Sequence, residues 1–229
     1  MASRVDVVLR KLPAELKSIR KQYEASLTNG KISDDLLHDI ARLIEDCQRV
    51  LDWTATDIDR VHGTARDRSP YYPLQAGRTK FDAAMKKDFA SVPQAVHDAM
   101  EKHQPYQSGK ESLGYLHDLA RVNKHQDFAP QTRTETTRIR AAGRGGVVEW
   151  TPYSPGQGGV QFGAGVEILG VPVDPRTQLP VPSSTQAVTK VIYVGWNFAE
   201  LDIPVLTTLE SLSELIPEAI TEVRQAAGL

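Results

Sequence analysis

Apolar side chains recur every three or four positions at the start of the chain, a period that predicts an amphipathic helix. The first helix is expected over residues 3–28. Pro13 lies inside this run and lacks a backbone N–H, so it is expected to kink the helix or to make it start anew. Asn29 and Gly30 tolerate a positive φ and are expected to end it. The apolar stripe consists of Val5, Val8, Leu9, Leu12, Leu16, Ile19, Tyr23 and Leu27.

A second apolar stripe predicts a longer helix over residues 33–62, with Ser33 as its N-cap. Two long helices joined by a short turn favour an antiparallel helical hairpin. Three shorter helices are expected farther along the chain, and the last of them ends in a dense group of polar side chains. They cover residues 80–89, 93–103 and 109–128.

The pattern changes after residue 128, where short β-prone runs separated by turns predict strands and suggest an antiparallel meander of about four. The expected strand regions cover residues 133–141, 147–151, 160–173 and 186–196. A final apolar stripe from Leu206 to Val223 predicts a C-terminal helix that Pro217 kinks or splits in two.

These elements predict an α+β fold, in which an antiparallel helical bundle carries a small antiparallel β-sheet insertion. The apolar stripe of the C-terminal helix needs a partner, and the N-terminal hairpin is the obvious one. The chain is therefore interpreted as one domain, with a helical bundle over residues 1–132, a β-rich insertion over 133–200 and a returning helix over 201–229.

Composition narrows the class of protein. The 229 residues include 40% hydrophobic residues and have a net charge of −2, so a core is expected but a general attraction to nucleic acid or to a membrane is not. The single cysteine, Cys47, cannot form an internal disulfide and is interpreted as a buried apolar residue in a reducing cytoplasm. The N-terminus has no long apolar run, so neither a signal peptide nor a membrane anchor is expected.

The polar group at the end of the third short helix is the strongest candidate site. His117, Arg121 and His125 are spaced four residues apart, so they project from one helix face in a column. Lys124 flanks this column. Asn123 falls on the apolar stripe, where a buried amide must find partners such as the carbonyls at the helix end.

These side chains supply the functional groups that a metal-independent ribonuclease needs. In such an enzyme the RNA 2′-hydroxyl attacks the adjacent phosphate. His125 would act as general acid or base, and Arg121 and Lys124 would stabilise the charge on the phosphorane. The alternative is a structural helix end, with Asn123 and Lys124 as caps and His125 favourable against the helix dipole. The histidines have no metal-site spacing such as HExxH, so neither a metal nor a cofactor is expected.

A second polar face lies on the expected helix 33–62, where His38, Arg42, Glu45 and Arg49 follow one another at three- or four-residue spacing. One interpretation is a solvated face stabilised by charge pairs. The other is that His38 and Arg42 face a ligand or a second subunit.

Two stretches of the sequence contain recognisable motifs. The first contains Leu37, His38, Asp39 and Ile40, with Glu45 or Asp46 in a later acidic place. The second contains the turn Gln104-Pro105-Tyr106 and then Leu116, Asp118, Leu119, Asn123, Lys124 and His125. Both stretches resemble a group of bacterial helical proteins of the HEPN-like class. In that group a β-rich segment and a closing helix follow, which the resemblance also implies for this chain.

Two hypotheses of different classes follow. The first is an RNA-directed HEPN-like protein, a toxin or phage-defence component that acts as a homodimer through its helical face. The second is a non-catalytic interaction module, in which Asn123, Lys124 and His125 fasten the helix end into the bundle. Solvent access at that helix end distinguishes them.

Overall fold

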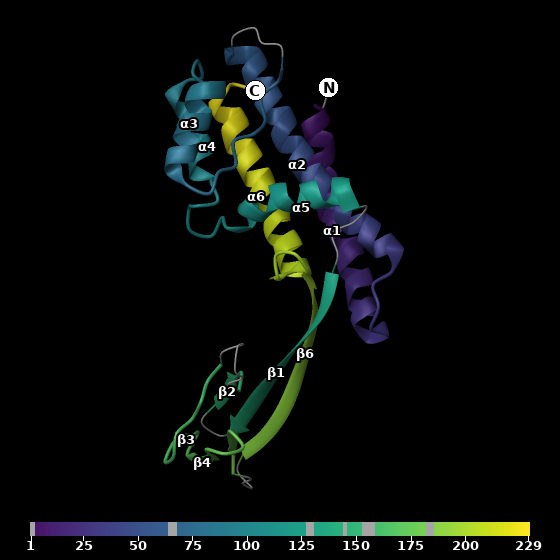
Figure 1. Ribbon diagram of the computed structural model, residues 1–229, viewed down its shortest axis with the longest axis vertical. Coiled ribbons are helices and arrows are strands. Elements are labelled where there is room, and N and C mark those ends of the chain that lie inside the picture. The colour runs from purple at the N-terminus through teal and green to yellow at the C-terminus, as the bar shows by residue number, and fades with distance from the viewer. Residues whose placement is uncertain (1–2, 64–67, 127–130, 144–145, 153–158, 182–185) are drawn as a thin grey trace. The chain divides into compact units, whose positions relative to one another are not determined.

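The computed structural model describes residues 3–63, 68–126, 131–143, 146–152, 159–181 and 186–229. Its helices and small antiparallel sheets confirm the predicted α+β fold with a helical bundle (Figure 1). The chain divides into two compact units. The helical unit comprises residues 1–132 and 196–229, and the β unit comprises residues 133–195.

The helical unit is built on a hairpin of two long helices, α1 (Arg4–Asn29) and α2 (Asp34–His62). A capping box begins α1, because the Ser3 hydroxyl accepts from the Asp6 N–H while the Asp6 carboxylate accepts from the Ser3 N–H. Gly30 ends this helix at a φ of 66°. Ser33 caps α2 by accepting a hydrogen bond from the Leu36 N–H. The predicted hairpin is therefore confirmed.

Both proline-containing helices run through their proline. α1 continues through Pro13, and α6 (Val205–Ala226) continues through Pro217, so neither the restart nor the split that was expected as the alternative to a kink occurs. The helices persist because buried side chains on both sides of each proline hold the backbone in place across the missing hydrogen bond. In α1 these include Leu12 and Ile19, and in α6 they include Ile216 and Ile220.

Three shorter helices complete this unit: α3 (Arg78–Asp88), α4 (Gln94–Lys102) and α5 (Ser112–Gln126). α6 packs against α1, α2 and α4, while α5 crosses α2 and α6 (Figure 1). α5 begins three residues later than expected, because Gly109 adopts a φ of 77°, outside the helical region. No described helix has the length and apolarity needed to cross a bilayer.

The strands form two sheets. β1 (Gln131–Gly143), β2 (Gly146–Trp150), β6 (Gln186–Phe198) and β7 (Ile203–Pro204) make a four-stranded sheet in the order β2-β1-β6-β7. β3 (Glu167–Ile168), β4 (Val171–Asp174) and β5 (Leu179–Pro180) make an antiparallel three-stranded sheet. A single four-stranded meander is therefore wrong, because β1 has the distant β6 as its second neighbour.

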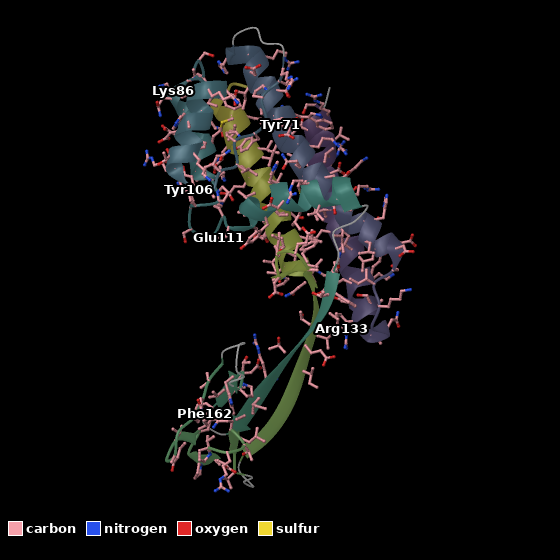
Figure 2. The ribbon with its side chains drawn as sticks, viewed as in Figure 1. Tyr71, Lys86, Tyr106, Glu111, Arg133 and Phe162 are labelled. Carbon is pink, nitrogen blue, oxygen red and sulfur yellow. The ribbon has the colours of Figure 1, made fainter. Side chains whose placement is uncertain are left out.

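The β unit has a small core of its own, formed by Ile139, Ala141, Trp150, Ile168 and Val173. Phe162, labelled in Figure 2, meets the Trp150 ring edge-on at a centroid distance of 5.4 Å. Gln178 holds the Phe162 backbone from both sides, accepting from its N–H at 2.6 Å and donating to its carbonyl at 3.1 Å. The hydrogen bonds thus fix an aromatic pair at the centre of this core.

A buried network joins the end of β6 to α1 within the helical unit. The Trp196 backbone N–H donates to the Tyr23 hydroxyl, and its indole N–H donates to the Ser26 hydroxyl, both at 2.9 Å. Ser26 in turn donates to the Tyr23 carbonyl at 2.6 Å. Since all three residues are buried, these donors and acceptors satisfy one another away from water.

Candidate functional site

α5 has a buried side and an exposed side, as the spacing of its residues predicts. Leu113, Leu116, Leu119 and Ala120 are buried. His117 and Arg121 are exposed on the other side. The Arg121 side chain is 60% exposed, and its guanidinium lies 3.9 Å from the Asp118 carboxylate. An exposed pair at this distance is weak, so the guanidinium is available to a ligand.

His117 and Arg121 line a cavity of about 580 Å³ in the helical unit. Its wall comes from α2, from the segment between α2 and α3, and from α5, and consists of Gln48, Asp52, Tyr71, Tyr72, Leu74, Gln75, His117, Ala120 and Arg121. Small-ligand sites have volumes of roughly 300–1,000 Å³. The cavity is therefore large enough to hold a ligand of drug or nucleotide size.

Two hydrogen bonds hold the segment opposite α5 in place. The Tyr72 N–H donates to the Asp52 carboxylate of α2 at 3.2 Å. The Gln75 N–H donates at 3.0 Å to the side-chain carbonyl of Gln104, which is fully buried and belongs to the Gln104-Pro105-Tyr106 turn. Because both acceptors are anchored in the helical unit, this wall of the cavity is preformed.

The segment presents two adjacent tyrosines in different environments. Tyr72 is buried, and burial raises the pKa of its phenol. Tyr71, labelled in Figure 2, is 79% exposed, an unusual position for a large aromatic ring. Its exposed ring can stack on a planar ligand at the cavity.

A smaller compartment of about 250 Å³ adjoins the cavity along α2. It is lined by Glu45, Gln48, Arg49, Asp52, Trp53 and Ala120. Gln48, Asp52 and Ala120 line both spaces, which makes the two compartments neighbours. The guanidinium groups of Arg4 and Arg49 lie over the Trp53 ring, 4.8 Å and 5.9 Å from its centroid.

The far end of α5 is fastened to α2. Asn123 is buried, and its side-chain amide donates to the Ala41 carbonyl at 3.4 Å. One partner of this amide is thus on another helix, in addition to the carbonyls of the helix end that the sequence suggested as partners. α5 continues through Lys124 and His125, but the side chains of these two residues lie outside the described part of the structure.

His38 and Arg42 are not among the residues that line the α5 cavity. Arg42 forms an ion pair with Glu15 of α1, and this hydrogen bond raises the pKa of the guanidinium. His38 is exposed, and its Nδ1 lies 3.9 Å from the Asp39 carboxylate. The pairing of Arg42 corresponds to the charge-paired interpretation of this face.

A separate polar group joins α4 to α6. His103 is fully buried, and its Nε2 lies 2.9 Å from Glu222; with Glu218 these residues place possible ligand atoms within 4.8 Å of one another. Lys102 contacts both Glu222 oxygens at 2.7 and 2.8 Å, and Lys110 lies 3.0 Å from Glu218. Hydrogen bonds from Lys102 and then His103 lower the pKa of Glu222. Both carboxylates thus have cationic partners, as in an ion-pair network.

The cavity could not be found from the sequence of α5, because six of its nine lining residues lie outside that helix. Gln48 and Asp52 are four residues apart on α2, and their side chains are hydrogen-bonded to each other at 3.2 Å. Tyr71 and Tyr72 stand in a proline-bounded segment that suggested only a short extended piece. Comparisons of the chain with family models, with curated proteins and with solved structures give no match.

Proposed function

We propose that the helical unit binds single-stranded RNA at the α5 cavity. The observation that carries this proposal is that Arg121, His117 and the exposed Tyr71 line one cavity. A guanidinium forms strong, directional hydrogen bonds with phosphate, and an aromatic ring stacks on an unpaired base. These two kinds of contact are the ones that single-strand binding proteins combine.

The charge of the helical unit limits how much of a strand it can hold. This unit has 21 basic and 25 acidic residues, so a long phosphate backbone is not attracted along its surface. Binding is therefore confined to the cavity and involves about one or two phosphates. The affinity should fall with salt at a slope of about −0.7 per phosphate contact.

Fluorescence anisotropy with labelled single-stranded RNA octamers tests this proposal. Arg121→Ala and Tyr71→Ala should each weaken binding by about tenfold, since each removes one contact to phosphate or base. Lys86→Ala removes an exposed charge on α3 (Figure 2) that does not line the cavity, so it should leave binding unchanged. Absence of binding by the wild type, or an equal loss in Lys86→Ala, would contradict the proposal.

A second candidate is ribonuclease activity at the end of α5. It is favoured by the continuation of α5 through Gln126, which keeps the backbone of position 125 in helical register with His117 and Arg121. In this hypothesis His125 is the acid or base, with Arg121 and Lys124 as phosphate ligands, in a cytoplasmic HEPN-like homodimer. Cleavage that persists in a metal chelator and is lost in His125→Ala would support it. Light scattering tests the dimer.

The non-catalytic interaction module is the alternative. It is favoured by Asn123, whose amide is bonded to the Ala41 carbonyl and therefore fastens α5 to α2. This function predicts that neither RNA binding nor RNA cleavage is found, while Asn123→Ala lowers the stability of the helical unit. The RNA assays above thus decide between the two classes.

A further inference from the structure

The smaller compartment beside Trp53 differs in chemistry from the larger cavity. A cavity of about 150 Å³ holds a benzene molecule, so the 250 Å³ of this compartment are enough for one nucleobase. Trp53 supplies an aromatic wall, and Glu45 supplies a carboxylate. Arg49 also lines this compartment, whereas the larger cavity has Arg121 and His117 in its wall, and both spaces share Asp52.

Glu45 is the acidic group of this compartment that is open to a ligand. Its side chain is 36% exposed, and its ion pair with Arg49 is long, at 3.9 Å. Arg49 lies closer to Asp46, at 2.6 Å, so it neutralises that carboxylate first. Glu45 therefore retains acceptor capacity on the exposed side of α2.

Asp52 stands at the boundary between the two spaces but is already engaged. It accepts from the Gln48 amide and from the Tyr72 N–H, each at 3.2 Å. These contacts make it a positioning residue that fixes the shared wall. Of the two carboxylates of the compartment, Glu45 is thus the one that can accept hydrogen bonds from a ligand.

We propose that the compartment is a base-selecting subsite in which Glu45 accepts hydrogen bonds from a base with two adjacent N–H donors. This inference rests on the proposed function. Guanine has such an edge, whereas uracil has one N–H between two carbonyls that a carboxylate repels. Since Gln48 and Ala120 line both spaces, one base enters beside Trp53 while the neighbouring nucleotide lies at Tyr71 and Arg121.

Fluorescence anisotropy with four RNA strands tests the subsite. One strand is an all-uridine octamer, and in each of the other three a single uridine is replaced by guanosine, adenosine or cytidine. The wild type should bind the guanine-containing strand about tenfold more tightly than the all-uridine strand. Glu45→Gln should reduce this preference to about twofold, because it weakens binding of the guanine-containing strand and relieves the repulsion of the uracil carbonyls. Glu24→Gln, an exposed acid on α1 that does not line either compartment, should keep the full preference.

The outcomes separate this inference from the function on which it rests. Equal binding of all four strands by the wild type, with Arg121→Ala weakening each of them, overturns the base-selecting subsite and leaves RNA binding standing. A guanine preference that persists in Glu45→Gln also overturns it. Failure of every strand to bind overturns both proposals. A melting temperature of Glu45→Gln equal to that of the wild type would confirm that the variant is folded.

Discussion

The helical unit and the β unit use their apolar residues in different ways. In the helical unit one large core joins α1, α2, α5 and α6, and it includes the fully buried rings of Phe81 and Phe198. Among the residues that the structure describes, the core cluster of the β unit has five buried members. Of the large apolar side chains that the structure describes as exposed, most also belong to it: Val147, Val148, Val160, Leu179, Val181 and Ile192.

The two units therefore differ in the source of their stability. Packed helices bury enough apolar surface to be stable through their core. A small sheet with one thin core depends more on backbone pairing and on a few side chains. The units also differ in charge, since the β unit has six basic and four acidic residues while the helical unit has an acidic excess. Three changes test this contrast, taken from the largest expected effect to the smallest.

Leu51→Ala should cause the largest loss, because Leu51 is buried in the middle of α2. The cavity left behind should lower the free energy of unfolding of the helical unit by about 4 kcal/mol, measured by urea unfolding followed by circular dichroism. Val61→Ala is the matched control on the same helix, since Val61 is 52% exposed. A loss for Leu51→Ala no larger than that of the control would show that this core is not the main source of stability.

Trp150→Ala should destabilise the β unit by about 3 kcal/mol and leave the helices intact. The change removes the indole that packs against Phe162 at the centre of the small core. Hydrogen exchange should become faster within residues 133–195, while amides of α1 and α2 keep their protection. Val148→Ala, at an exposed position of the same strand, serves as the control. Equal loss of protection in α1 and α2 would mean that the two units unfold as one.

Lys102→Met should have the smallest effect, because the ion pair with Glu222 is partly exposed to solvent. The pKa of Glu222 is lowered in the folded protein, so this group stabilises the fold above its unfolded pKa and loses that contribution as the pH falls. The wild type should therefore have the higher melting temperature at neutral pH, and the difference should vanish in acid. Lys86→Met on α3 controls for loss of a surface charge. A difference that is unchanged at low pH would argue against the ion pair.

The helices could be predicted from the sequence because their apolar stripes are long. The expected limits of α1 and α2 lie within one residue of the observed ones. At Pro13 local backbone chemistry leaves a kink or a restart open, and the restart does not occur because tertiary packing keeps α1 continuous. The pairing of β1 with β6 could not be predicted, because strand partners are chosen by contacts between distant parts of the chain.

The candidate site was predictable only in part, for a similar reason. The exposure of His117 and Arg121 follows from helical periodicity, which one stretch of sequence contains. The opposite wall depends on tertiary hydrogen bonds, from Tyr72 to Asp52 and from Gln75 to Gln104. Such contacts between distant residues leave no periodic signal, so the cavity emerges only when the folded chain is known.

The chain leaves the helical unit along β1 and returns along the adjacent β6. The Thr134 hydroxyl donates to the Gly195 carbonyl at 3.3 Å, so the exit and the re-entry are neighbours. Because the two ends of residues 133–195 lie side by side, closing this loop costs little conformational entropy. A tight turn would be enough to join the two ends in its place. Evolution or protein engineering can therefore replace, lengthen or delete residues 133–195 without changing the path of the chain in the helical unit.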